Sequence, residues 1–148
     1  MKTPAPIVVG VDGSPSSLEA LTWAVRQAAL TGAGVEAVIA WEYPPLSGVD
    51  PTTAHVDWRT KAQQTIDETL ARGEGADGVE VSSVVIAGHP AEVLVEASAG
   101  AQLLVVGNRG RGAFTEMRPG SVREQVIAQA TCPVLVMCHP AQAVPSSE

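Results

Sequence analysis

A glycine-rich stretch between residues 107 and 121 has the composition of a phosphate-binding loop. Glycines stand at positions 107, 110, 112 and 120, with Arg109 and Arg111 between them. The apolar run at 103–106 predicts a buried strand before this stretch, and apolar spacing in 122–130 predicts an amphipathic helix after it. Glycines let the main chain approach a ligand closely, and free N–H groups at a helix N-terminus favour an anion. The stretch therefore indicates a phosphate ligand, with added attraction from the two arginines.

The same residues also have a purely structural interpretation. Ser121 is a good helix N-cap, and Glu124 completes a capping box, so the glycines could serve only to shape a loop. Two other phosphate-binding motifs are absent. No Gly-Lys-Ser/Thr occurs, and the turn after the first predicted strand lacks the dinucleotide-binding glycine pattern. These residues alone leave both interpretations open.

Asp12 is the second candidate for chemistry. It follows the apolar run Ile7–Val11, whose continuous apolar character predicts a strand buried on both faces. Ligands of open α/β sheets bind outside the carboxyl ends of the strands. Asp12 could contact a ribose hydroxyl there, or a Mg²⁺ ion bound to phosphates. Alternatively, it forms an Asx-turn or caps the next helix.

Strands and helices are predicted to alternate along the chain. Further strands are expected at 35–41, 79–87 and 132–138, and further helices begin near Pro15, Trp58 and Pro90. Five strands alternating with four helices predict a three-layer α/β/α sandwich, Rossmann-like, with a mainly parallel sheet of order 3-2-1-4-5. We expect one domain over residues 1–148, with its core at about 6–138 and a loose tail at 139–148. If the first and fourth strands are neighbours, Asp12 faces the glycine-rich stretch across a crevice.

Composition and charge narrow the classes of partner. A net charge of −7 argues against a general nucleic-acid or anionic-membrane surface. No apolar run approaches the roughly 20 residues of a membrane span. The first residues lack the apolar region and cleavage site of a signal peptide, so we expect a cytoplasmic protein.

Histidine and cysteine give weak signals. His89 is either a ligand contact or an exposed residue of the turn before Pro90, and no histidine has the neighbours of a metal site. Cys132 and Cys138 are not spaced like a redox pair or a zinc site, so buried structural thiols are expected.

The sequence resembles the universal stress protein family over nearly the whole chain, from Ile7 to Met137. Four segments carry the resemblance: residues 9–17 with the helix that follows, 88–91, 103–112 and 132–136. The ATP-binding branch of that family has Gly, two residues, Gly, nine residues, Gly and then Ser or Thr. Gly107, Gly110, Gly120 and Ser121 match this spacing.

The resemblance implies an ATP site with Mg²⁺. The glycine-rich loop would bind the phosphates and ribose, Asp12 would lie near the ribose or a phosphate-bound Mg²⁺, and the main chain near Ala40 and Trp41 would hold the adenine. The residues implied to contact the nucleotide are Gly10, Asp12, Ala40, Gly107, Arg109, Gly110, Gly120, Ser121, Val122 and Arg123.

Two departures from the family pattern lie within this site. Arg123 stands where the family usually has a hydroxyl that can reach a phosphate. Its guanidinium could pair with a phosphate bidentately, or its bulk could crowd the site. Arg118 and Pro119 stand where apolar residues are usual.

These signals favour an ATP-binding regulatory protein of the stress response, with no catalytic residues assigned and at most weak ATP hydrolysis. The family resemblance also implies a homodimer that pairs through its last strand, here Pro133–Met137. Alternatively, the tail after His139 covers that strand. Two other functions stay open: a stress-protein dimer that works through protein contacts without nucleotide, and an enzyme that uses an adenine nucleotide.

Overall fold

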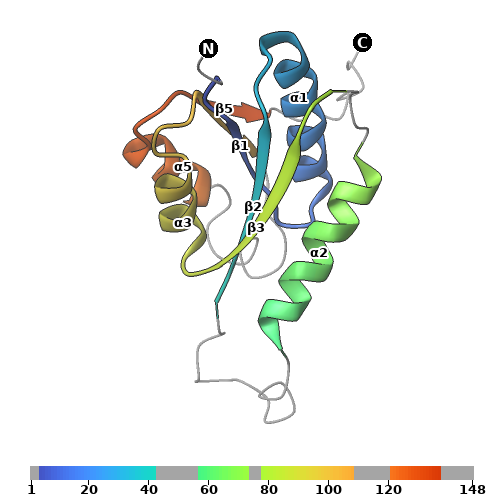
Figure 1. Ribbon diagram of the computed structural model, residues 1–148. Helices are drawn as coiled ribbons and strands as arrows, with labels where there is room; N and C mark the ends of the chain where they lie inside the picture. The colour runs from blue at the N-terminus through green and yellow to red at the C-terminus, as the bar shows by residue number, and fades with distance from the viewer. Residues whose placement is uncertain (1–3, 43–56, 74–77, 109–120, 138–148) are drawn as a thin grey trace, which may run out of the picture.

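The computed structural model describes residues 4–42, 57–73, 78–108 and 121–137, which form a parallel β-sheet with helices on both faces (Figure 1). The strands are β1 (Ile7–Gly10), β2 (Val35–Trp41), β3 (Val81–Ala87), β4 (Leu103–Gly107) and β5 (Val134–Met137). The helices are α1 (Pro15–Thr31), α2 (Trp58–Arg72), α3 (Pro90–Ala97) and α5 (Ser121–Gln129). The five-stranded sheet has the order β3-β2-β1-β4-β5, and every neighbouring pair is parallel. The predicted α/β fold and strand order are confirmed.

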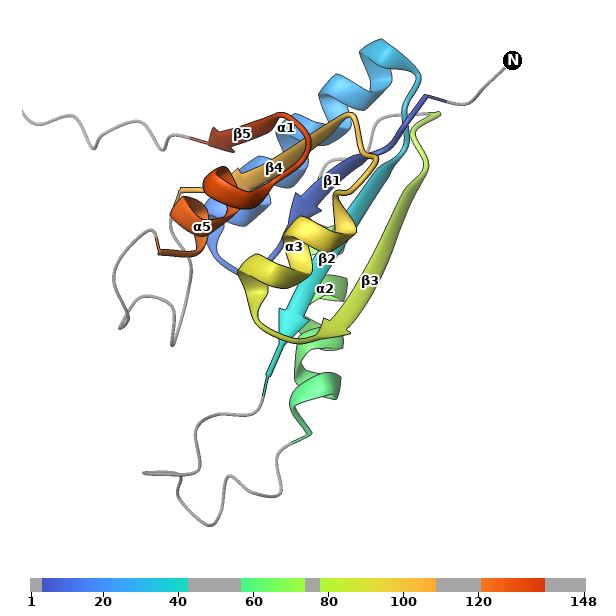
Figure 2. The ribbon, with the colours of Figure 1, turned by 90° about the vertical axis from the view of Figure 1, so that its left-hand side faces the viewer.

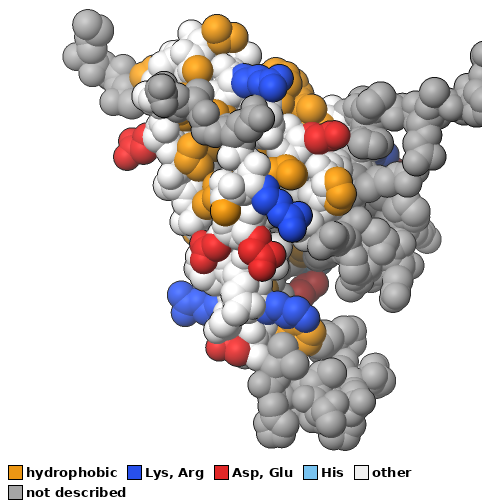
Figure 3. All heavy atoms as spheres, turned by 90° about the vertical axis from the view of Figure 1, so that its right-hand side faces the viewer, with side chains coloured by type: hydrophobic (Ala, Val, Ile, Leu, Met, Phe, Trp, Pro, Cys, Tyr) orange, Lys and Arg blue, Asp and Glu red, His pale blue; other side chains and the backbone are white. Residues whose placement is uncertain are grey.

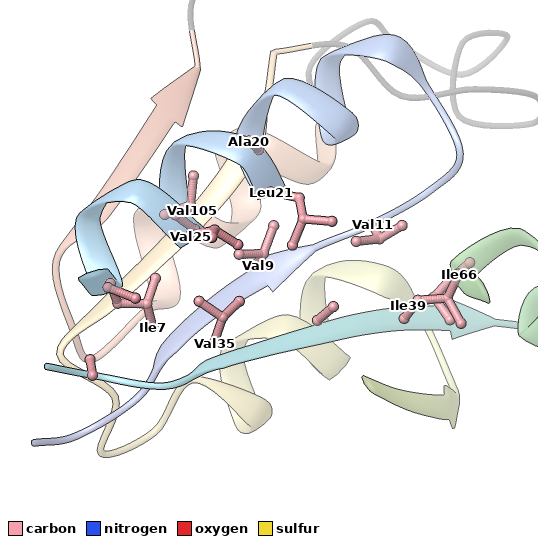
Figure 4. Close-up of a cluster of buried hydrophobic side chains, with 14 of the residues drawn as sticks. Ile7, Val9, Val11, Ala20, Leu21, Val25, Val35, Ile39, Ile66 and Val105 are labelled. Atoms are coloured by element: carbon pink, nitrogen blue, oxygen red, sulfur yellow. The ribbon is translucent and has the colours of Figure 1, made fainter. Parts of the chain in front are cut away.

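The central strand β1 is buried on both faces because helices cover both sides of the sheet. Ile7 and Val9 join one core cluster with α1 and α2, and Figure 4 shows these side chains between the helices and the sheet. Val8 points the other way, into a second cluster with α3 and α5. Figure 2 shows α3 and α5 in front of the sheet and α1 behind it. β1 is therefore apolar along its whole length because both of its faces are buried, as predicted.

Side chains of the preceding turns cap α1 and α2. Ser14 Oγ accepts from the Ser17 N–H at the start of α1 (3.1 Å), and Pro15 follows at the first helical position. Asp57 caps α2 by accepting hydrogen bonds from the Thr60 hydroxyl and N–H. These bonds, with the hydroxyl bond the larger cause, hold the pKa of the Asp57 carboxyl below its usual value.

Several element boundaries differ from the predicted ones by one or two residues. β1 ends at Gly10 rather than Val11, although the Val11 N–H still donates to Val38 O (2.8 Å). β3 begins at Val81 rather than at residue 79, although the Glu80 carbonyl oxygen accepts from the Val35 N–H (2.8 Å). β5 covers 134–137 rather than 132–138, with Pro133 just before it. Such shifts are common where strands and helices fray.

The face over α1 and α2 carries charges of both signs with apolar side chains between them (Figure 3). Lys61 in α2 lies over the Trp58 ring, with Nζ 5.4 Å from the ring centroid. Within the part of the chain that the structure describes, no helix is long and apolar enough to cross a membrane.

Replacing Leu104 with alanine should destabilise the fold strongly. Leu104 is fully buried in β4, so Leu104→Ala should lower the free energy of unfolding by about 2–5 kcal/mol through lost burial and a residual cavity. Leu30→Ala is the matched control, because Leu30 in α1 is 82% exposed and its truncation should change stability by less than about 0.5 kcal/mol. Urea unfolding followed by circular dichroism measures both, and equal midpoints for the two variants would contradict this packing.

Candidate functional site

The candidate site lies where β1 and β4 end side by side. β1 pairs with β2 on one side and with β4 on the other, and Val9 is opposite Val105. The chain moves outward from β1 to β2 and β3, then returns to β4, so the strand order reverses between β1 and β4. Figure 2 shows the two strands next to each other. This reversal is the position at which open α/β sheets bind ligands.

Asp12 occupies the turn between β1 and α1. Its Oδ1 accepts a hydrogen bond from the Ser14 N–H (2.9 Å), and its own N–H donates to Ser17 Oγ (3.3 Å). Asp12 therefore forms the Asx-turn that was one of its two interpretations. These bonds fix its carboxylate at the carboxyl end of β1, which is also where the ligand interpretation requires it.

Ser16 joins the first turn of α1 to the end of β4. The Asn108 N–H donates to Ser16 Oγ over 2.6 Å. A Cβ atom at Gly107 would lie 2.4 Å from that oxygen and 2.9 Å from the Ser16 carbonyl carbon. Only glycine at position 107 allows this approach, so the first glycine of the loop is required by packing whether or not it also faces a ligand.

Arg123 joins the first turn of α5 to the same point. Its Nη1 donates a hydrogen bond to Asn108 Oδ1, and both side chains are half-buried. Asn108 is thus held through its main chain by α1 and through its side chain by α5. Side chains from the first turns of these two helices, which lie on opposite faces of the sheet, thus converge on Asn108 at the end of β4. Each of these helix N-termini carries the positive end of a helix dipole.

Ser16 and Asn108 were not predicted as site residues. No local spacing pattern connects them, because they lie 92 positions apart in sequence. The available signals were a serine in the first turn of a predicted helix and an asparagine directly after a predicted strand. Only the strand order shows that these two positions meet.

Gly10 and Val122, both implied contacts of the nucleotide, pack against the core. A Cβ atom at Gly10 would lie 2.9 Å from Leu94 Cδ1, so glycine there allows α3 to pack closely on β1. The Val122 side chain is half-buried against the cluster on the α3 and α5 face. Any contact that Val122 makes with a phosphate would therefore come from its main chain.

Ala40 lies beyond the end of β1 on the neighbouring strand. Gly10 is the last β1 residue paired with β2, and it is opposite Val38. Val38 O accepts from the Val11 N–H, whereas Trp41 O accepts from the Gly88 N–H next to β3 (2.8 Å). Because main-chain groups alternate sides along a strand, the N–H and C=O of Ala40 face the β1 side, past the point where β1 ends. This orientation suits the expected contact with an adenine edge.

Other candidates have structural roles or fall outside the described residues. His89 is half-buried, and its Nδ1 accepts from the Ala91 N–H at the start of α3 (3.3 Å). Cys132 is half-buried with a free thiol. Arg109, Gly110, Arg111, Gly120, Cys138 and the Ser121 side chain lie outside the described residues.

A resident metal cluster has no support in the described ranges, where no three His, Cys, Asp or Glu side chains gather to hold an ion. A Mg²⁺ ion held by a nucleotide needs fewer protein ligands, because it keeps several waters and takes one or two carboxylates plus phosphate oxygens. The fixed carboxylate of Asp12 meets that requirement.

Comparison with known proteins identifies the family of this chain. The model of the universal stress protein family matches residues 5–137. Universal stress protein Rv2005c of Mycobacterium tuberculosis is 41% identical over 136 residues, which are 89% of this chain and 45% of that protein. The chain thus spans less than half the length of this curated relative.

Two solved structures share the fold over nearly their whole length. A universal stress protein in complex with cAMP is 26% identical, with a TM-score of 0.70 over 93% of this chain and 99% of that one. A protein of the family from Burkholderia pseudomallei is 27% identical, with a TM-score of 0.68 over 93% and 98% of the two chains. The family model extends from before β1 to the end of β5, so this chain belongs to the universal stress protein family.

Proposed function

We propose that this domain binds an adenine nucleotide, ATP with Mg²⁺, at the carboxyl edge of the sheet between β1 and β4. The observation that supports the proposal is that side chains from the first turns of α1 and α5 both bond to Asn108 at the end of β4. The positive ends of two helix dipoles at one edge of the sheet favour a polyanion. The solved relative bound to cAMP, an adenine nucleotide, supports the same class of ligand.

Each part of the nucleotide has residues suited to it. Main-chain N–H groups would bind the phosphates, and Arg109 would add positive charge. The residues proposed to supply these N–H groups are Gly107, Gly110, Gly120, Ser121 and Val122. Asp12 would hold Mg²⁺ or the ribose. Ala40 would pair with the adenine edge through its main chain, on the side of β2 that β1 leaves open.

The biological role that fits this site is regulation rather than efficient catalysis. No Ser–His–Asp or Cys–His arrangement of a nucleophile and a base can be placed from the sequence. We infer a cytoplasmic stress-response module whose affinity for a partner changes with nucleotide occupancy, which requires ATP to bind two states of the module unequally. A dimer that works without nucleotide is the alternative that the binding experiment tests.

Replacing Asp12 with asparagine tests the nucleotide and the metal together. The asparagine side chain would keep an oxygen to accept from the Ser14 N–H, so the turn should survive while the negative charge is lost. Calorimetry on nucleotide-stripped protein should give a micromolar or tighter Kd for MgATP, at least about −8 kcal/mol. Asp12→Asn should weaken MgATP about tenfold. It should not weaken ATP in EDTA, because the carboxylate no longer repels the phosphates.

Asp67→Asn is the control, because Asp67 is exposed in α2 and should leave both affinities unchanged. Equal MgATP affinity for Asp12→Asn and the wild type would limit Asp12 to its role in the turn. Absence of both heat and thermal shift with excess ATP in the wild type would reject the nucleotide proposal and favour the nucleotide-independent dimer.

The dimer is proposed through β5, which is an edge strand of the sheet, like β3. A lysine on an edge strand discourages pairing between sheets. Val134→Lys on β5 should therefore shift the protein from dimer to monomer in sedimentation velocity, with circular dichroism as the check that the fold survives, because Val134 also packs against the core on the α3 and α5 face. Val81→Lys, on the opposite edge strand β3, should leave the dimer intact. A monomeric wild type at tens of micromolar, or a dimer lost only in Val81→Lys, would exclude pairing through β5.

A further inference from the structure

Arg123 has a hydrogen-bond partner that was not predicted from the sequence. Its guanidinium donates to the side-chain oxygen of Asn108, the residue that directly follows β4. The main chain of Asn108 is fixed in turn by Ser16 in α1. A continuous path of hydrogen bonds thus links the first turn of α1, the end of β4 and the first turn of α5.

The surroundings of Arg123 make this partner important. A cation in the first turn of a helix lies at the unfavourable end of the helix dipole. Arg123 is also half-buried, whereas its acidic neighbour Glu124 is exposed. The Asn108 oxygen supplies an acceptor where the charge needs one, and a hydrogen bond to a charged group is stronger than a neutral one. Asn108 and Arg123 therefore depend on each other.

We propose that Arg123 is a positioning residue that holds the first turn of α5 against the end of β4 through Asn108. The N–H groups of that turn then keep a fixed place at the carboxyl edge of the sheet. As a consequence for ligand binding, which rests on the proposed function, the contact pre-organises the helix end for a phosphate and lowers the cost of ordering it on binding.

This role differs from direct phosphate binding in a measurable way. If Arg123 acts through Asn108, removing either side chain has the same effect, and removing both adds nothing. If Arg123 is itself a phosphate ligand, the loss of Asn108 leaves the affinity intact or raises it by freeing the guanidinium. A double-mutant cycle with Asn108→Ala and Arg123→Met separates these cases.

The first measurement needs no nucleotide. Hydrogen exchange of the α5 amides should rise by similar amounts in Asn108→Ala and Arg123→Met, and no further in the double variant. Arg123→Lys, which keeps a charged donor, should exchange more nearly like the wild type. Arg26→Met, at an exposed arginine of α1, is the control and should change nothing. Unchanged exchange in Arg123→Met would overturn the proposal.

The second measurement is the Kd for MgATP in the same proteins. Each single variant should bind about tenfold more weakly, the double variant no more weakly than either, and Arg123→Lys should recover most of the loss. A loss in Arg123→Met with unchanged affinity in Asn108→Ala would overturn the positioning role. If the wild type binds no MgATP, the proposed function fails. The exchange cycle alone then decides the inference: coupled variants support it and uncoupled variants overturn it.

Discussion

The close contact between Ser16 and the end of β4 is the constraint on which the site depends. The first turn of α1 approaches β4 so closely that no side chain fits at Gly107, and the Ser16 hydroxyl occupies that space while accepting from the Asn108 N–H. This contact brings the N-terminus of α1 to the carboxyl edge of the sheet. A larger residue at 107 would push the helix away and remove one of the two positive helix ends from the candidate ligand.

Burial of the sheet on both faces fixes the position of this contact between α1 and β4. Ile7, Val8 and Val9 of β1 are each at most 1% exposed. Their side chains alternate between the two faces of the sheet and pack against the helices there. A one-residue shift of β1 would exchange the two sets of side chains, so packing on both faces fixes its register. Packing therefore fixes where β1 ends, and with it the place of the turn that carries Asp12.

The sequence predicted the architecture well because periodicity and burial are local signals. Continuous apolar runs identified the strands, and glycine, proline and capping residues identified most helix starts to within a residue. For Asp12, the Asx-turn was one of two interpretations, and the hydrogen bond from the Ser14 N–H confirms it, while the ligand contact stays a prediction. The contacts of Ser16 with Asn108, and of Asn108 with Arg123, could not be predicted, because they arise only when strand order brings distant segments together. Gly10 and Gly107 show the same limit. Both were interpreted as ligand contacts, and each also has a packing requirement that only three-dimensional structure reveals.

Arg123 shows why a position in a motif does not by itself define a role. A hydroxyl at this position is short and neutral, so it can face a phosphate without disturbing the helix end. A guanidinium is long and charged, and near a helix N-terminus it is repelled by the same dipole that would attract a phosphate. It is tolerated where an acceptor lies within reach, and Asn108 is that acceptor. The asparagine side chain therefore converts an apparent obstruction into a connection between β4 and α5. The residue at 123 can be understood only together with the residue at 108, although the two lie 15 positions apart in the sequence.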